Sequence, residues 1–449
     1  MNVGFLKIKK YTQLEPENFV ERGLNILFNC KVKIVDAVMG SGKTSAAINF
    51  INNSDNDAHF LYITPYLTEV ERIVEQCSEK HFKEPKNING RKLEGLKRLI
   101  KRDTNIASTH ALFHIFDREL IDLCRAHNYT LIMDEVADVI KPYSITQDDK
   151  KLLFESFVEI DPDTCFLKWK KNAVDYQGRF SNEHRLCDLQ CLAVYGDKED
   201  IAKNQIMMWL FPIETFNAFR NIYILTYLFE SQVQCYYYKF YALPYTSIYV
   251  RGDSVENYSF TENKEEAHQV SKEYNQLIHI CDNERMNQIG DRETDLSKGW
   301  YDRNKDGAVL QIKRNLQNYF LRVRQVKSND LIWTTFKDYK DLLKNKGYGK
   351  GFLPLNTRAS NKYRDRTSIA YPVNRYLNTL VKRFFTTKGV NVDEDGYALS
   401  EMLQFIWRSA IRDDKEIWVY IPSIRMRTLL QNWIDENSVT SVTSEEGGN

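Results

Sequence analysis

Residues 32–44 read VKIVDAVMGSGKT, an apolar strand that runs directly into a glycine-rich turn ending in Lys-Thr. Residues 44–50 are helix-prone, so the stretch has the order of strand, loop and helix that a P-loop requires. Gly40 and Gly42 can take backbone angles closed to other residues, which lets successive N–H groups curl around a phosphate at a helix N-terminus. The stretch therefore predicts a triphosphate site in an α/β domain.

The polar groups of this loop predict the cofactors ATP and Mg²⁺. Lys43 is expected to reach the β- and γ-phosphates, and the Thr44 hydroxyl to ligate Mg²⁺, which prefers hard oxygen donors in near-octahedral geometry. The general pattern has glycine where this chain has Ala37, so the alternative is a glycine-rich turn without function. The expected nucleotide-binding residues are Gly40, Ser41, Gly42, Lys43, Thr44 and Ser45.

Two carboxylates, Asp134 and Glu135, follow the apolar run 131–133. At the tip of a buried strand, Asp134 can hold Mg²⁺ through water while Glu135 polarises the water that attacks the γ-phosphate. The alternative is an acidic helix start, where the helix dipole favours Asp and Glu. Because the pair lies downstream of a P-loop, we expect it to be catalytic together with Lys43, with Thr44 and Asp134 as the magnesium ligands.

Short apolar runs alternate with stretches of helical periodicity, and the pattern appears twice along the chain. Such alternation is typical of parallel sheets flanked by helices, so we expect an α/β fold of two tandem P-loop-type domains. The expected domains are residues 1–230 with an insertion at about 144–212, residues 231–436 with an insertion at about 282–330, and a flexible tail at 437–449.

The expected strands lie in two groups. Those of the first domain are 32–38, 60–64, 105–108, 130–134 and 222–226, and those of the second are 247–250, 277–281, 331–335, 351–355 and 416–421.

Composition narrows the setting and the partners. Basic and acidic residues nearly cancel, 62 against 61, so any path for a polyanion must be local. Eight scattered cysteines favour a reducing cytoplasm over a disulfide-bonded secreted protein. Residues 1–17 do not resemble a signal peptide, and we expect no membrane association. His184, Cys187 and Cys191 suggest a metal site, yet a fourth ligand at a familiar spacing is missing.

The loop and the carboxylate pair resemble motifs I and II of superfamily 2 helicases, the DEAD/DEAH-like P-loop ATPases. The form Ala-x-x-Gly-x-Gly-Lys-Thr at 37–44 resembles motif I, and Asp-Glu-Val-Ala at 134–137 resembles motif II. The resemblance implies two tandem RecA-like domains and an ATP hydrolase stimulated by nucleic acid. The general arrangement of these motifs, rather than any one diagnostic motif, is similar to that of the helicase-like proteins of phage and prophage replication modules.

Further short motifs follow in the order of that superfamily. Residues 63–66 resemble motif Ia, 107–110 the next strand-end motif, 333–336 motif IV, and 356–360 stand where motif V is expected. Thr226 resembles motif III, which couples hydrolysis to strand movement. The nucleic-acid contacts that the resemblance implies are Thr64, Pro65, Thr109, His110, Thr335, Asn356, Arg358 and Ser360. The alternative for each is an ordinary turn residue.

Residues 404–412 resemble motif VI, which supplies an arginine to the γ-phosphate. Gln404 and Arg408 keep the spacing of the family, but Arg412 falls one residue late and Trp407 replaces a glycine. Either arginine therefore remains a candidate. On one helix, Gln404, Arg408 and Arg412 would share a face because they are spaced by four.

The function that the resemblance implies is an ATP-dependent helicase or translocase in phage or prophage replication, in the bacterial host cytoplasm. DNA is favoured over RNA as its partner, and replication proteins are further expected partners. Two basic, aromatic stretches, 313–322 and 361–366, could add phosphate contacts or be ordinary amphipathic helices. The alternatives are an ATP-gated loader or scaffold without strand separation, and a small-molecule P-loop kinase, which leaves the arginines of the second domain unexplained.

Overall fold

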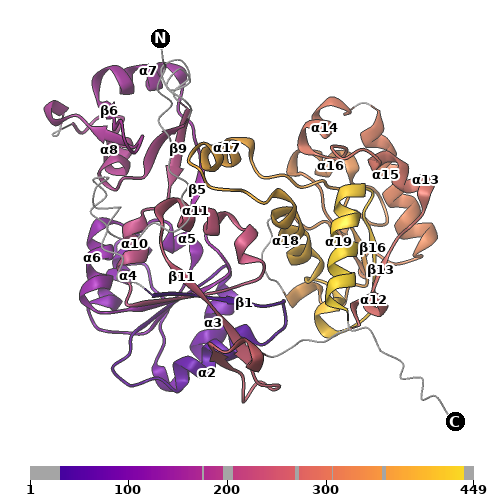
Figure 1. Ribbon diagram of the computed structural model, residues 1–449, viewed down its shortest axis with the longest axis horizontal. Coiled ribbons are helices and arrows are strands. Elements are labelled where there is room, and N and C mark those ends of the chain that lie inside the picture. Colours follow the sequence, from indigo (N-terminus) through magenta and orange to yellow (C-terminus); the bar gives the residue numbers. More distant parts are fainter. Residues whose placement is uncertain are drawn as a thin grey trace. The chain divides into compact units, whose positions relative to one another are not determined.

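The computed structural model describes residues 31–173, 176–195, 206–267, 273–305, 307–355 and 361–438 (Figure 1). The chain forms two compact units. The first contains the described residues up to Ala37, residues 42–267 and Asn378–Asp393, and the second contains Val38–Ser41, His268–Leu377 and the residues from Glu394 onward. No helix within the described ranges is long and apolar enough to cross a membrane.

A seven-stranded sheet in the order β12-β11-β1-β10-β4-β2-β3 forms the centre of the first unit. Neighbouring strands are parallel except β12, which is antiparallel to β11. The strands are β1 (Lys31–Asp36), β2 (Phe60–Thr64), β3 (Ile106–Thr109), β4 (Thr130–Asp134), β10 (Asn221–Thr226), β11 (Tyr245–Arg251) and β12 (Ser259–Thr261). Continuous apolar runs form the central strands because helices cover both faces.

Helices flank this sheet, with α2 and α3 on one side and α10 and α11 on the other (Figure 1). The core beneath α2 and α3 includes Val35, Ile48, Tyr62 and Ile73. The helices of the unit are α2 (Lys43–Asn52), α3 (Leu67–Gln76), α4 (Lys92–Ile100), α5 (His110–Phe113), α6 (Arg118–Ala126), α10 (Ile213–Asn217), α11 (Val233–Tyr241) and α17 (Thr379–Thr387).

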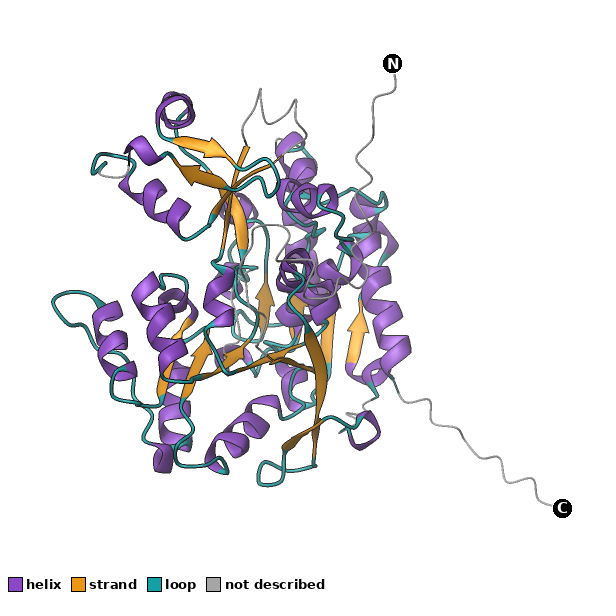
Figure 2. Cartoon of the chain, turned by 60° about the vertical axis from the view of Figure 1, so that its left-hand side comes forward, coloured by secondary structure: helices purple, strands orange, loops and turns teal. Residues whose placement is uncertain are grey.

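The expected insertion of the first domain is a small subdomain of mainly antiparallel structure (Figure 2). Its sheet has the order β5-β9-β8, and β6 pairs with β7 in a separate ribbon. Leu153, Leu192 and Met207 lie in its own core. Its elements are β5 (Ile140–Tyr143), α7 (Gln147–Ser156), β6 (Val158–Ile160), β7 (Leu167–Trp169), α8 (Ser181–Asp188), β8 (Leu192–Tyr195) and β9 (Ile206–Leu210).

The second unit is built on four parallel strands in the order β13-β16-β15-β14. The strands are β13 (Ile278–Ile280), β14 (Leu331–Trp333), β15 (Ser368–Ala370) and β16 (Ile417–Tyr420). The helices are α12 (Tyr274–Leu277), α13 (Glu284–Asn287), α14 (Lys298–Arg303), α15 (Ala308–Asn318), the π-helical turn η6 (Tyr319–Val323), α16 (Lys340–Leu343), α18 (Glu394–Ile406) and α19 (Ile424–Asn437). Two parallel sheets flanked by helices confirm the expected α/β class.

Several expectations for the second half are wrong. The strand expected at 247–250 belongs to the first sheet, where β11 pairs with β1, so the first unit continues past the expected boundary at residue 230. Residues 351–355 form only one bridge, Trp333 to Phe352, and the fourth strand is β15 instead. The segment 282–330 is not a separate insertion, because it supplies much of the core of the second unit. Residues 1–30 and 439–449, which include most of the expected tail, lie outside the described residues.

Candidate functional site

The loop between β1 and α2 has left-handed backbone at both candidate glycines. Gly40 has φ 85° and Gly42 has φ 82°, values that favour glycine because it lacks a Cβ. Gly42 caps α2, and its carbonyl accepts a 2.8 Å hydrogen bond from the Ala46 N–H. The Lys43 ammonium donates a hydrogen bond to the Ala37 carbonyl, so the cation is folded against the backbone of its own loop.

The remaining loop residues lie at or just before the start of α2. Ser41 is buried, while Thr44 and Ser45 are half-buried in the first helical turn. Their hydroxyls lie at the N-terminus of α2, beside the first N–H groups of the helix. The partial positive charge of a helix N-terminus favours an anion there.

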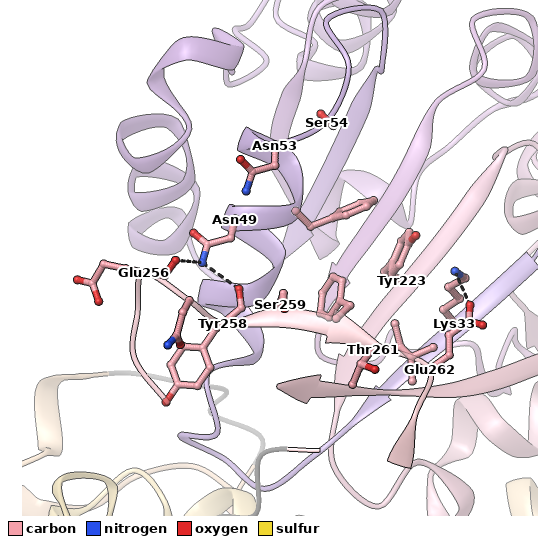
Figure 3. Close-up of a pocket in the computed structure, with 14 residues that line it drawn as sticks. Lys33, Asn49, Asn53, Ser54, Tyr223, Glu256, Tyr258, Ser259, Thr261 and Glu262 are labelled. Carbon is pink, nitrogen blue, oxygen red and sulfur yellow. Dashed lines mark hydrogen bonds and ion pairs between the residues drawn. The ribbon is translucent and has the colours of Figure 1, made fainter. Parts of the chain in front are cut away.

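A turn between β11 and β12 packs against the same helix (Figure 3). The Asn49 amide donates to the carbonyls of Val255 and Tyr258, both at 2.9 Å. The Tyr258 ring lies so close to Gly42 that a Cβ at that position would come within 2.7 Å of it. A groove of about 490 Å³ runs between α2 and β12, with Phe50 and Phe260 among its aromatic lining. Tyr258 therefore restricts residue 42 to glycine.

The acidic pair lies at the same edge of the sheet as this loop, with one strand, β10, between β1 and β4. In the register of the strands, Val35 of β1 is opposite Leu225 of β10, and Leu225 is opposite Asp134 of β4. Since neighbouring strands are about 4.8 Å apart, the Asp134 backbone lies roughly 10 Å from β1. The loop and the carboxylates therefore flank the carboxyl end of β10, which lies between them.

Hydrogen bonds hold the backbone of the acidic pair. Glu135 has φ 71°, and its N–H donates to the Leu225 carbonyl at 3.0 Å. The His110 Nε2 lies 3.0 Å from the Asp134 carbonyl oxygen. The Gln234 side chain, which is fully buried on α11, accepts the Ala137 N–H at 2.7 Å. The turn after β4 is therefore fixed from two sides.

Thr226, at the end of β10, is buried and joined to both neighbouring loops. Its carbonyl accepts the Ala37 N–H at 3.1 Å, and its hydroxyl donates to the Gln232 side chain at 3.0 Å. These two hydrogen bonds connect the start of the phosphate loop with the segment after β10.

Asp36 is a site residue that the sequence motifs did not indicate. Its carboxylate accepts the N–H groups of Leu228 at 2.8 Å and Phe229 at 2.9 Å, which fixes the turn that follows Thr226. Burial raises the pKa of Asp36, and these two hydrogen bonds and the charge of Lys43 only partly oppose it. The only signal in the sequence was an acidic residue at the end of an otherwise apolar strand.

The expected nucleic-acid contacts of the first unit lie at the ends of β2 and β3. Thr64 and Thr109 are direct neighbours in the register of these strands. Thr64 is fully buried, Pro65 and Thr109 are half-buried, and the buried His110 ring lies against the Asp134 backbone. Of this set, Pro65 and Thr109 have side chains partly open to solvent.

The expected contacts of the second unit are mostly outside the described residues. Thr335 is buried just after β14, with 1% of its surface exposed. Asn356, Arg358 and Ser360 fall in 356–360, which is outside the described ranges.

Gln404, Arg408 and Arg412 do not share one helix face, contrary to the expectation. Helix α18 ends at Ile406, so only Gln404 is on it, and Arg412 lies in a separate 3-10 turn, η10 (Ala410–Asp413). Ser409, between them, is extended with ψ −169°, and the Ala410 N–H bonds to the Arg366 carbonyl at 2.9 Å. This long-range hydrogen bond replaces the helical one and breaks the spacing of four. Arg408 is buried, with its guanidinium 5.4 Å from the Phe405 ring centroid.

No group of three or more His, Cys, Asp or Glu side chains is placed to hold a metal ion within the part of the chain that the structure describes. His184 stacks on Trp169 with ring centroids 4.4 Å apart, and Cys187 and Cys191 are buried in the subdomain core. Burial raises the pKa of each of these two thiols to about 12, which disfavours the thiolate that binds metals.

A relative from Bacillus subtilis aligns with nearly the whole chain. The SPbeta prophage-derived uncharacterized protein YonV of Bacillus subtilis (strain 168) is 36% identical over 417 residues, which are 90% of this chain and 99% of that protein. This chain belongs to the YonV family. Family models for the YonV middle domain and the YonV C-terminal Rossmann-like domain match residues 140–209 and 272–434.

The two matches correspond to separate parts of the structure, but the second also spans Asn378–Asp393, which belong to the first unit. The middle domain of the YonV family corresponds to the subdomain from β5 to β9, and the Rossmann-like domain to the parallel sheet of the second unit. The chain also aligns with the structure of S. tokodaii Xpd4, at 11% identity and a TM-score of 0.47, over 90% of this chain and 94% of that one. A likeness this weak carries no functional argument.

Proposed function

We propose that this YonV family member is an ATP-dependent motor on nucleic acid, a helicase or translocase, with DNA as the favoured substrate. One observation supports the proposal above the others. The left-handed glycine loop that follows β1 and the carboxylate pair at the end of β4 are at the same sheet edge, with only β10 between the two strands. That spacing suits a loop that holds the phosphates and a glutamate that activates water.

The residues present fit ATP with Mg²⁺. The Thr44 hydroxyl and the Asp134 carboxylate are the hard oxygen donors that Mg²⁺ prefers, and a site with so few protein ligands suits an ion that also binds substrate phosphates and water. When bound, the ion would offset the negative charge of the phosphates. Gly40, Ser41, Gly42 and Ser45 would contribute N–H groups and hydroxyls to the same phosphates.

Three charged side chains are proposed to act on the phosphates and on the attacking water, each in a different role. Lys43 leaves the Ala37 carbonyl to pair with the β- and γ-phosphates. Glu135 accepts a proton from the attacking water, a contribution of about 100-fold or more in rate. Arg408 or Arg412 of the second unit stabilises the charge that develops on the γ-phosphate.

Thr226 is proposed as the coupling residue because its bonds reach both Ala37 and Gln232. Strand movement would follow from closing and reopening the two units around ATP. Thr109 is the proposed phosphate contact in the first unit, because its half-buried hydroxyl at a strand end can donate to a phosphate oxygen. Pro65 has no hydrogen-bond donor and would make only van der Waals contact with the strand.

Phosphate release by the purified chain, with and without single-stranded DNA, tests the proposal. We expect DNA-stimulated hydrolysis that Lys43→Ala abolishes by loss of ATP affinity, and that Glu135→Gln abolishes while a fluorescent ATP analogue still binds. Glu155→Gln, an exposed change in the middle domain, is the control. Absence of hydrolysis under every condition, with ATP bound, would contradict a motor.

A strand-displacement assay separates the motor from its alternative, an ATP-gated loader or scaffold. Duplexes with a single-stranded tail at either end are offered with ATP. Displacement that requires Glu135 supports the helicase. If the Glu135→Gln variant retains the biological activity of the protein, the loader is favoured instead. The prophage origin of the B. subtilis relative is the reason to seek that activity in phage or prophage replication.

A further inference from the structure

The chain is neutral overall, but its charge is unevenly distributed. Between residues 305 and 366, fifteen lysines and arginines stand against five aspartates and no glutamate. The whole chain has 62 basic and 61 acidic residues, so a polyanion could bind only where positive charge is in local excess. This segment of the second unit has such an excess.

Tertiary contacts bring part of this excess onto one surface. Helix α15 contacts α16, and the Asn345 amide donates to the Gln317 side chain at 3.0 Å. The Tyr348 hydroxyl lies 3.4 Å from the Lys313 carbonyl, and a Cβ at Gly347 would lie 3.1 Å from the Leu321 side chain. The loop 344–350 therefore lies along α15 and η6. We name the exposed cations of these elements the basic face: Arg314, Arg322, Lys344, Lys346 and Lys350.

Within the described ranges, no carboxylate forms an ion pair with any residue of the basic face. Of the acids near this surface, Asp341 is exposed on α16, three residues before Lys344, and others pair with cations outside the basic face. Asp338 pairs with Lys298 at 2.6 Å, and Asp365 pairs with Arg366 at 3.2 Å. The Arg314 guanidinium donates a hydrogen bond to the neutral Gln311 side chain at 3.4 Å. The five cations of the basic face thus exceed the one exposed carboxylate, Asp341, that lies beside them on α16.

The geometry points to a nucleic-acid backbone as the partner. Arg314 and Arg322 are eight residues apart, roughly 12 Å along a helix. That distance spans several phosphates of a strand, which rise about 3.4 Å each in a duplex, and exceeds what one small anion could bridge. The nearby aromatic side chains of Tyr319, Tyr339 and Tyr348 are buried, so the surface offers no platform for stacking bases.

We propose that the basic face is a second nucleic-acid contact of this chain, which binds the phosphate backbone without reading its sequence. The cation cluster stands independently of the ATP site, and only the identity of the partner rests on the proposed function. The contact would hold the second unit on its track in every nucleotide state, because none of its residues belongs to the ATP-binding loop.

Salt-dependent binding of a fluorescein-labelled DNA duplex tests this inference. The variant is Lys344→Gln with Lys346→Gln and Lys350→Gln, and the control is Lys86→Gln with Lys171→Gln and Lys264→Gln, three exposed lysines of the first unit. Removing three phosphate contacts should lower the slope of log affinity against log salt by about 2 to 3. The affinity at about 100 mM salt should fall tenfold or more, and the control should behave as the native chain.

Each outcome decides between the two proposals. Equal slopes for the variant and the native chain overturn the basic face, and DNA-stimulated ATP hydrolysis in the same preparation would leave the motor intact. A lower slope in a chain that hydrolyses no ATP supports the basic face and removes the motor. Leu321 and Val323 are exposed beside the cations, at 37% and 49%. Loss of binding to phosphatidylserine vesicles, with DNA binding unchanged, would therefore overturn nucleic acid in favour of a lipid surface.

Discussion

The Ser231 hydroxyl donates a 2.8 Å hydrogen bond to the Asp393 carboxylate, across 162 positions of the sequence. Ser231 lies just before Gln232, the partner of Thr226, and Asp393 lies just before Glu394, the first residue of α18. The Tyr236 hydroxyl is 3.0 Å from both the N and the O of Asp393. The segment 378–393 follows β15 and precedes α18 in the sequence. Its last residue, Asp393, is thus hydrogen-bonded to Tyr236 of α11 in the first unit.

Removing either partner of this bond should weaken the attachment. We expect Ser231→Ala and Asp393→Ala each to lower the free energy of unfolding by about 1 kcal/mol, with the double variant losing less than the sum because the two groups share one hydrogen bond. Urea unfolding of the four chains measures the coupling. Asp395→Ala, two residues further along and bound to Arg425, is the control for loss of a charge there. Additive losses would show that the bond contributes nothing.

Gly42→Ala should harm the phosphate loop more than Gly40→Ala. Both glycines have left-handed φ, which costs an alanine about 1–2 kcal/mol, but only a Cβ at residue 42 would meet the Tyr258 ring. We expect a larger loss of affinity for a fluorescent ATP analogue in Gly42→Ala, partly restored when Tyr258→Ala is added. Equal losses of affinity in Gly40→Ala and Gly42→Ala would show that contact with the Tyr258 ring does not matter.

Gln234→Leu should slow ATP hydrolysis with little change in ATP affinity. The change leaves the Ala137 N–H without its 2.7 Å partner, at a cost of about 1–3 kcal/mol, and loosens the turn that carries Glu135. Turnover and affinity are measured separately, by phosphate release and by analogue fluorescence. Gln431→Leu, on the exposed side of α19, is the matched control. A loss confined to affinity would contradict the positioning role.

The stability of the first unit should fall in acid through Glu119. Hydrogen bonds from Lys97 at 2.8 Å and Lys101 at 2.9 Å hold the pKa of Glu119 at about 2, below its ordinary value. A lowered pKa stabilises the fold above the ordinary pKa of about 4.3, and that stability is lost as pH falls toward about 2. We expect the melting temperature of Glu119→Gln to fall less than that of the native chain over this range. The exposed Glu79→Gln should follow the native chain.

The sequence alone predicted the elements whose causes are local. The five expected strands of the first sheet are all present, because apolar runs between helical stretches suit only buried parallel strands. The left-handed angles of Gly40 and Gly42 follow from the lack of a side chain at those positions. The place of Asp134 and Glu135 at a strand tip was equally readable, since charge ends an apolar run.

Only the tertiary structure decided which of these pieces meet. A run such as 245–251 encodes a strand but not its partner, and its pairing with β1 enlarged the first unit. The hydrogen bond from the Ala410 N–H to the Arg366 carbonyl lies where a helix from Gln404 to Arg412 would have continued, and α18 ends at Ile406 instead. Contacts between distant residues also place His110 and Gln234 against the turn that follows β4. Similar contacts bring the cations of α15 and of the loop 344–350 together. The local sequence pattern favours a helix, a strand or a turn at each position, whereas long-range packing and hydrogen bonding decide which of these elements lie side by side.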